Sequence, residues 1–174
     1  MDRRYPIGTF RCERDISATQ REMWIREIEE LPARLKEAVK GLSEDQLNLP
    51  YRERGWTLRQ VVHHLADSHM ISFIRFKLAL TEDTPTIRPY FEDRWAELQD
   101  SKETDIQISF MLLEGLHKRW AILLKSMEKS DFEKQFYHPE SQQTVRLDYN
   151  LGYYAWHGKH HTAHITALRN LLNI

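Results

Sequence analysis

The chain has 174 residues, of which 41% are hydrophobic and 29% charged, and its formal net charge is −1. This is the composition of one globular domain, and the balanced charge argues against a surface that binds nucleic-acid phosphates or anionic lipid. The one cysteine, Cys12, excludes an internal disulfide and a multi-cysteine metal site. No apolar run approaches the length of a signal peptide or the roughly 18 residues of a spanning helix, so we expect a single cytoplasmic domain over 1–174.

Three of the four long helices that we predict start with Ser or Thr followed three residues later by Gln, the capping-box pattern. The first follows Ser17 and covers 21–42, with Pro32 expected to kink it. The second follows Thr57, and the third follows Thr104. The fourth starts after Asp148 and ends near residue 172.

Two shorter segments connect these helices. Residues 91–99, "FEDRWAELQ", predict a short extra helix. Residues 134–147, "KQFYHPESQQTVRL", place aromatic and β-branched residues on both sides of Pro139 and Ser141, which is typical of a small hairpin. The predicted fold class is therefore all-α, an antiparallel four-helix bundle with a short hairpin or irregular insert before the last helix.

The last predicted helix contains four histidines in the stretch "WHGKHHTAH". At about 100° per residue, His157 and His161 fall near the centre of the apolar stripe, His160 falls at its rim and His164 lies between. Two histidines one turn apart can bind one metal ion. The alternative is a pair of core histidines that are hydrogen-bonded to carbonyl or hydroxyl groups, and the spacing leaves it open.

The second predicted helix carries a narrow polar line on one side, which suits a helix that lines a cavity. This line consists of Thr57, His64, Asp67, Ser68 and Arg75. His64 is the candidate third ligand, with His63 as a rival near the other edge. Three histidines would leave one coordination position open for water or substrate.

Three other residues bear on the chemistry of such a site. Asp67 could orient a ligand imidazole or transfer a proton. Arg75 could bind an anionic group of the substrate or pair with a carboxylate such as that of Asp67. Gly158 stands where a metalloprotease motif has its glutamate base, which counts against peptide hydrolysis.

The segments "GWTLRQVVHHLADSHM", "IRFKLALTEDTPTIRPY" and "WHGKHHTAHI" closely resemble the YfiT-like branch of the DinB superfamily. The resemblance covers nearly the whole chain and implies a four-helix bundle that forms a homodimer. It also implies one divalent metal ion. Imidazole ligands suit several metals, and we expect zinc, or nickel in the isolated protein. Carried onto this sequence, the family pattern gives His64, His157 and His161 as the metal ligands.

The resemblance implies two kinds of enzyme. Members of the family are described as metal-dependent hydrolases, and relatives in the superfamily transfer low-molecular-weight thiols such as bacillithiol. We expect thiol transfer to an electrophilic small molecule, because a metal-bound thiol is deprotonated without a built-in glutamate base. Hydrolysis would need a metal-activated water and a base such as Asp67. A non-catalytic metal-binding or stress-response protein is the third alternative.

Overall fold

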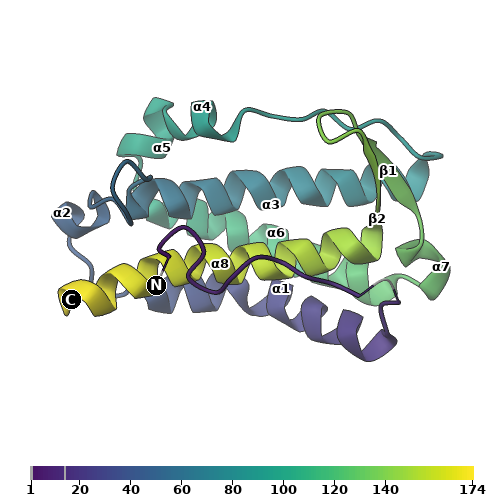
Figure 1. Cartoon of the computed structure of the whole chain (residues 1–174), viewed down its shortest axis with the longest axis horizontal. Coiled ribbons are helices and arrows are strands. Elements are labelled where there is room, and N and C mark those ends of the chain that lie inside the picture. The colour runs from purple at the N-terminus through teal and green to yellow at the C-terminus, as the bar shows by residue number, and fades with distance from the viewer. Residues whose placement is uncertain (1, 14) are drawn as a thin grey trace.

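Four long helices form the body of the molecule (Figure 1). The structure is a computed structural model, and it describes residues 2–13 and 15–174. The long helices are α1 (Ala18–Val39), α3 (Leu58–Thr81), α6 (Ile106–Ser126) and α8 (Leu147–Leu172). The predicted four-helix bundle is therefore confirmed, and α1 continues through Pro32 without a break in its helical structure.

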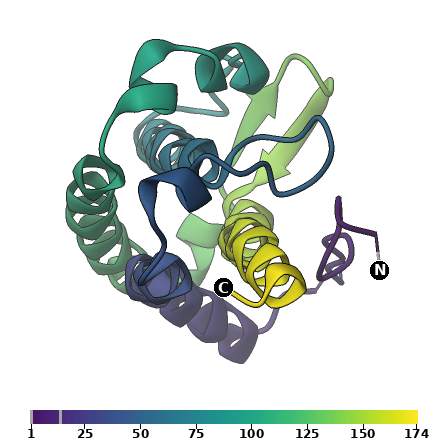
Figure 2. The same cartoon turned by 90° about the vertical axis from the view of Figure 1, so that its left-hand side faces the viewer.

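The long helices are arranged so that α1 packs on α6 and α8, and α3 packs on the same two helices (Figure 2). The pairs α1/α6 and α3/α8 are antiparallel, as predicted (Figure 1). A long crossover over 82–105 brings the chain back to the end of the bundle where α3 starts. As a result α3 and α6 run in the same direction, which short connections between successive helices would not produce.

The helix starts agree with the capping patterns at two of three places. Ser17 and Thr57 accept hydrogen bonds from the backbone N–H of the Gln three residues later. The third helix is capped by Asp105 instead of Thr104, since Asp105 accepts from the N–H of Gln107. Thr104 cannot serve there because it ends the preceding short helix. The fourth helix starts at Leu147, so Asp148 lies in its first turn rather than before it.

The connections contain the predicted hairpin and more helix than predicted. Strands β1 (Gln135–His138) and β2 (Gln143–Arg146) pair antiparallel. The helix predicted over 91–99 corresponds to α4 (Glu92–Ala96), and a short helix that was not predicted, α5 (Gln99–Glu103), follows it. Two further single-turn helices, α2 (Glu44–Leu47) and α7 (Lys129–Phe132), were not predicted, because four residues are too few to show a helical period.

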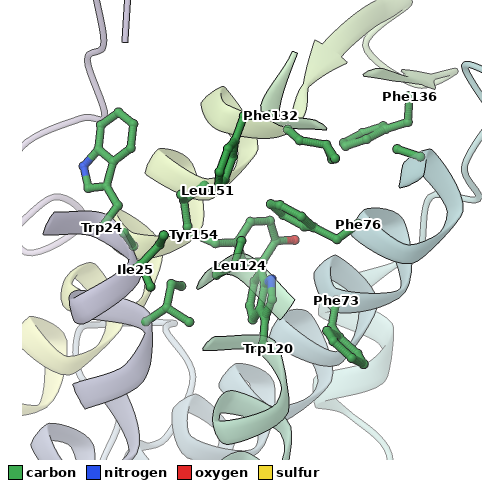
Figure 3. Close-up of a cluster of buried hydrophobic side chains, with 14 of the residues drawn as sticks. Trp24, Ile25, Phe73, Phe76, Trp120, Leu124, Phe132, Phe136, Leu151 and Tyr154 are labelled. Carbon is green, nitrogen blue, oxygen red and sulfur yellow. The ribbon is translucent and has the colours of Figure 1, made fainter. Parts of the chain in front are cut away.

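The bundle has two apolar core clusters, one toward each end. One cluster, near the hairpin, packs aromatic residues such as Trp120, Phe76 and Phe136 against α1 and α8 (Figure 3). The other, near α2, is built mainly from Leu and Val side chains. Between them the buried side chains of α3, α6 and α8 are largely histidines: His64, His69, His117, His157 and His161. We call these five residues the histidine layer.

Within the described residues, no helix combines the length and apolar character needed to cross a lipid bilayer.

Candidate metal centre

His64 of α3 and His157 and His161 of α8 converge in the middle of the bundle. All three are buried, and each offers a ring nitrogen that lies within 4.8 Å of those of the other two. The Nε2 atoms of His64 and His157 are 3.3 Å apart. Two nitrogens bound to one tetrahedral zinc ion lie about 3.3 Å apart, since Zn–N bonds are about 2.0–2.1 Å. The geometry thus fits joint ligation of one ion.

The three histidines are neutral in the folded protein, which is the protonation state that binds a metal cation. Burial lowers the pKa of His64 to about 3, and the charge of His164 acts in the same direction. Burial likewise holds the pKa values of His157 and His161 well below the usual value, assisted by the neighbouring imidazoles. Neutral imidazoles present the lone pairs that a divalent metal requires.

Trp56 closes the site on the side of the loop before α3. Its ring lies 4.5 Å, centroid to centroid, from that of His64 and 6.1 Å from that of His161. The residue directly after it, Thr57, caps α3, so the start of the helix also positions the indole. An apolar ring against two ligand candidates limits the access of water to this side.

Two buried histidines that the sequence analysis missed, His69 and His117, lie next to the candidate ligands. Nε2 of His69 lies 3.2 Å from Nδ1 of His157, and the rings of His69 and His117 stack with centroids 4.9 Å apart. His117 donates from Nδ1 to the carbonyl oxygen of Ile28 at 2.5 Å. If Nδ1 of His157 donates to His69, its Nε2 keeps the lone pair and faces the other candidate ligands.

His160 and His164 do not lie at an exposed rim, because the N-terminal segment and the loop before α3 cover them. The ring of His160 stacks on Trp156 with centroids 4.5 Å apart. His164 stacks on Tyr51 at 4.0 Å, and its Nε2 lies 3.3 Å from the carbonyl oxygen of Arg4. These two histidines are thus buried by packing, outside the group of three that could hold one ion.

The structure does not bring Asp67 or His63 to the site. Asp67 lines neither of the cavities at the histidines, and burial together with the charge of Asp100 raises its pKa to about 6. His63 has both ring nitrogens occupied, by the hydroxyl of Ser109 at 2.7 Å and the carbonyl oxygen of Thr104 at 3.0 Å. Both residues face the helices that pack on α3.

Gly158 has a packing explanation. A Cβ atom at this position would come within 2.7 Å of the side chain of Leu31, so α1 and α8 approach closely here. A glutamate at 158 would point toward α1 and away from the histidine cluster. The absence of the metalloprotease glutamate is therefore explained by helix packing. It does not by itself distinguish thiol transfer from hydrolysis.

Two cavities meet at the candidate site. One, of about 370 Å³, is lined by all three candidate ligands and by Trp56. The other, of about 620 Å³, extends toward the hairpin and is lined by His157 and Arg75. Tyr153 and His157 line both cavities, as do the two acidic residues at the start of α4, Glu92 and Asp93.

Glu92 and Asp93 are carboxylates that sequence reasoning missed at this site. Partial desolvation raises the pKa of Glu92, and the charges of Asp93 and Glu140 add to the effect. Both residues come from a short helix in the crossover, far in sequence from the histidine motifs. A local pattern does not reveal that the crossover folds over the site.

Comparisons with known proteins agree with this arrangement. A family model described as the DinB superfamily matches residues 18–165. A Bacillus cereus protein (strain ATCC 10987 / NRS 248) named "Putative metal-dependent hydrolase" is 58% identical over 99% of this chain and 98% of its own length. A Bacillus anthracis protein (strain CDC 684 / NRRL 3495) of the same name is 57% identical over the same shares.

A solved structure gives the same result for the fold. YfiT from Bacillus subtilis, described as a probable metal-dependent hydrolase with an unusual four-helix bundle topology, matches with a TM-score of 0.97 and 50% identity over 99% of each chain. The parallel pairs α3/α6 and α1/α8 are a departure from a simple antiparallel bundle in the present structure (Figure 1). The chain belongs to the DinB superfamily, in its YfiT-like branch.

Proposed function

We propose that this protein is a metal-dependent enzyme that transfers a low-molecular-weight thiol of the bacillithiol type to an electrophilic small molecule. His64, His157 and His161 would hold one divalent ion, zinc or nickel, both of which suit imidazole ligands. The names of its relatives support a metal-dependent enzyme. The reaction type is our inference.

The observation that carries the proposal is the pair of cavities that share His157 and Tyr153. A transfer reaction needs two reactants side by side, whereas hydrolysis needs one substrate and a water. One cavity reaches all three histidines, and the other approaches them from the hairpin side. Each is within the range of volumes that bind small molecules.

The residues of this chain have separate roles in such a reaction. When bound, a divalent ion lowers the pKa of a thiol or water that occupies its open position. His69 would hold His157 so that Nε2 points to the ion. Trp56 would exclude water from the His64 side, which protects a reactive thiolate and strengthens electrostatic interactions.

A conjugation assay tests this function. The zinc-loaded protein is incubated with bacillithiol and a panel of electrophiles, and loss of thiol and formation of adduct are measured. We expect metal-dependent conjugation that His161→Ala abolishes and His160→Ala retains. No conjugation with any electrophile of the panel, by protein that holds one zinc ion per chain, would contradict the proposal.

Hydrolysis of a small ester or amide is the second candidate, and Glu92 favours it because its carboxylate lines both cavities. Such a group could accept a proton from an attacking water. Glu92→Gln should then abolish hydrolysis in a screen without thiol, while Asp67→Asn should not. If Glu92→Gln retains thiol conjugation and the unmodified protein shows no hydrolysis, the results would favour thiol transfer over hydrolysis.

A further inference from the structure

Arg75 of α3 is buried without a partner in the part of the chain that the structure describes. Only 8% of its surface is exposed, and its Nε atom makes no hydrogen bond. No carboxylate of the described residues lies within 4.0 Å of its guanidinium group, so the pair with Asp67 considered from the sequence is not formed. A buried cation without a counter-charge is unfavourable, which suggests that a ligand supplies one.

The surroundings of Arg75 are those of a binding pocket. It lines the cavity of about 620 Å³ and lies over the ring of Phe136, with 5.9 Å from Cζ to the ring centroid. The hydroxyl of Tyr90, in the same cavity, is a second buried polar group; it lies beside the hydroxyl of Ser68 but forms no hydrogen bond of good geometry with a described residue. Two buried donor groups, the guanidinium of Arg75 and the hydroxyl of Tyr90, therefore line one cavity.

The acidic residues of this cavity do not neutralise Arg75. Glu92, Asp93 and Glu140 line the same space, but they are exposed, and none forms an ion pair with Arg75. Asp93 and Glu140 are exposed and the Glu92 carboxyl is only partly desolvated, whereas Arg75 is buried within the bundle. An anion that reaches Arg75 would therefore exchange hydration for a charge-assisted hydrogen bond at a site that no side chain occupies.

We propose that Arg75 and Tyr90 form a subsite for the carboxylate of a reactant, so that the enzyme selects acid-bearing small molecules. The inference rests on the proposed function in placing the reacting group at the histidines. The carboxylate binds Arg75 in the way that guanidinium groups bind carboxylates, with Tyr90 donating from its hydroxyl. An alcohol or amide of the same shape would leave the guanidinium group unpaired.

The spacing along α3 sets the length of this reactant. Arg75 follows His64 by eleven residues, which corresponds to about 16 Å of helix rise. Both side chains tilt toward the helix N-terminus, and the arginine side chain is the longer, so the guanidinium group lies closer to His64 than that, at roughly 10–16 Å. The carboxylate is therefore at the far end of an elongated molecule from the group that reacts.

Binding of a matched pair of probes tests the subsite without any reaction. Hexanoate and hexanol are titrated into the zinc-loaded full chain by calorimetry. We expect hexanoate to bind about tenfold more tightly or better, as for a hydrogen bond to a charged group. Arg75→Met should remove this preference, while Arg94→Gln, which removes an exposed arginine of the same cavity, should leave it within about twofold.

Two outcomes would overturn the inference. One is equal binding of hexanoate and hexanol to the unmodified protein. The other is that Arg75→Met still binds hexanoate more tightly than hexanol. The carboxylate would then bind at another site, such as the metal ion. If Arg75→Met does not fold, the Arg75 Nε–H resonance of the unmodified protein must shift with hexanoate and not with hexanol. Failure of thiol conjugation, by contrast, would leave these binding results unchanged.

Discussion

Mild acid should destabilise the metal-free protein, because the histidine layer must remain neutral in the folded state. Burial lowers the pKa of His64 to about 3 and of His117 to about 4, whereas an unfolded histidine has a pKa near 6.5. As the pH falls below about 6.5, the unfolded chain therefore binds protons that the folded chain does not bind. Stability is lost from that pH down to the folded pKa and does not change further below it.

The size of the effect follows from these pKa values. Between pH 7 and pH 5, each of His64 and His117 lowers the free energy of unfolding by about 1.8 kcal/mol, or about 4 kcal/mol together. The other members of the layer are also buried with lowered pKa values and add to the loss. Because the free energy of unfolding of a domain is about 5–15 kcal/mol, a large part of it is lost.

Urea unfolding of metal-free protein, followed by circular dichroism at pH 7, 6 and 5, measures this loss. His117→Gln is the informative variant, because its amide can still donate to the carbonyl oxygen of Ile28 but does not titrate. It should reduce the loss between pH 7 and 5 by about 1.8 kcal/mol. His138→Gln is the comparison variant: burial also lowers the pKa of this half-buried hairpin residue, but the residue lies outside the histidine layer and should reduce the loss by less. An unfolding free energy that is equal at pH 7 and 5 would refute the reasoning.

Three further predictions concern the metal, the packing and the assembly. Replacing any of the three candidate ligands by Ala should abolish stoichiometric metal binding, whereas His160→Ala should retain it. His69→Ala should weaken metal binding about 10- to 100-fold. Competition with a chelating dye measures the metal affinity of each variant. Gly158→Ala should destabilise by about 1–3 kcal/mol through contact with α1, while Gly115→Ala, where nothing lies within 4 Å, should stabilise by about 0.8 kcal/mol in urea titrations. We also propose a homodimer through the exposed apolar face of α6, and Met111→Glu should shift the mass to the monomer in light scattering.

The parts of the structure that the sequence predicts well are those determined by local periodicity. The four long helices and the position of His157 and His161 on the apolar stripe of the last helix follow from spacing within single segments. The choice of His64 over His63 came from the family resemblance. The direction of α6 does not follow from local spacing, because it depends on how the crossover over 82–105 folds. Thr104 fails as a cap because it is the C-cap of α5, the short helix of the crossover that directly precedes α6.

The remaining misses arise where two helices meet. His69 falls on the apolar side of α3, so a projection of that helix assigns it to the core, yet it contacts His157 of α8. Gly158 looked like a missing base until the contact with Leu31 showed a close helix approach. Asp67 lay on the predicted polar line but faces the charge of Asp100. In each case the neighbouring helix decides the role, and one segment contains no information about it.

The histidine layer connects stability with the proposed metal chemistry. Two apolar clusters hold the ends of the bundle, while the middle buries imidazoles that contribute less hydrophobic stabilisation than apolar side chains would. A metal that binds only the folded state raises the free energy of unfolding by about 2.7 kcal/mol when its free concentration is 100 times its Kd. Because unfolded histidines bind protons in its place, this gain decreases in acid. Metal occupancy and resistance to acid should therefore change together, which links loss of the ion to loss of the fold.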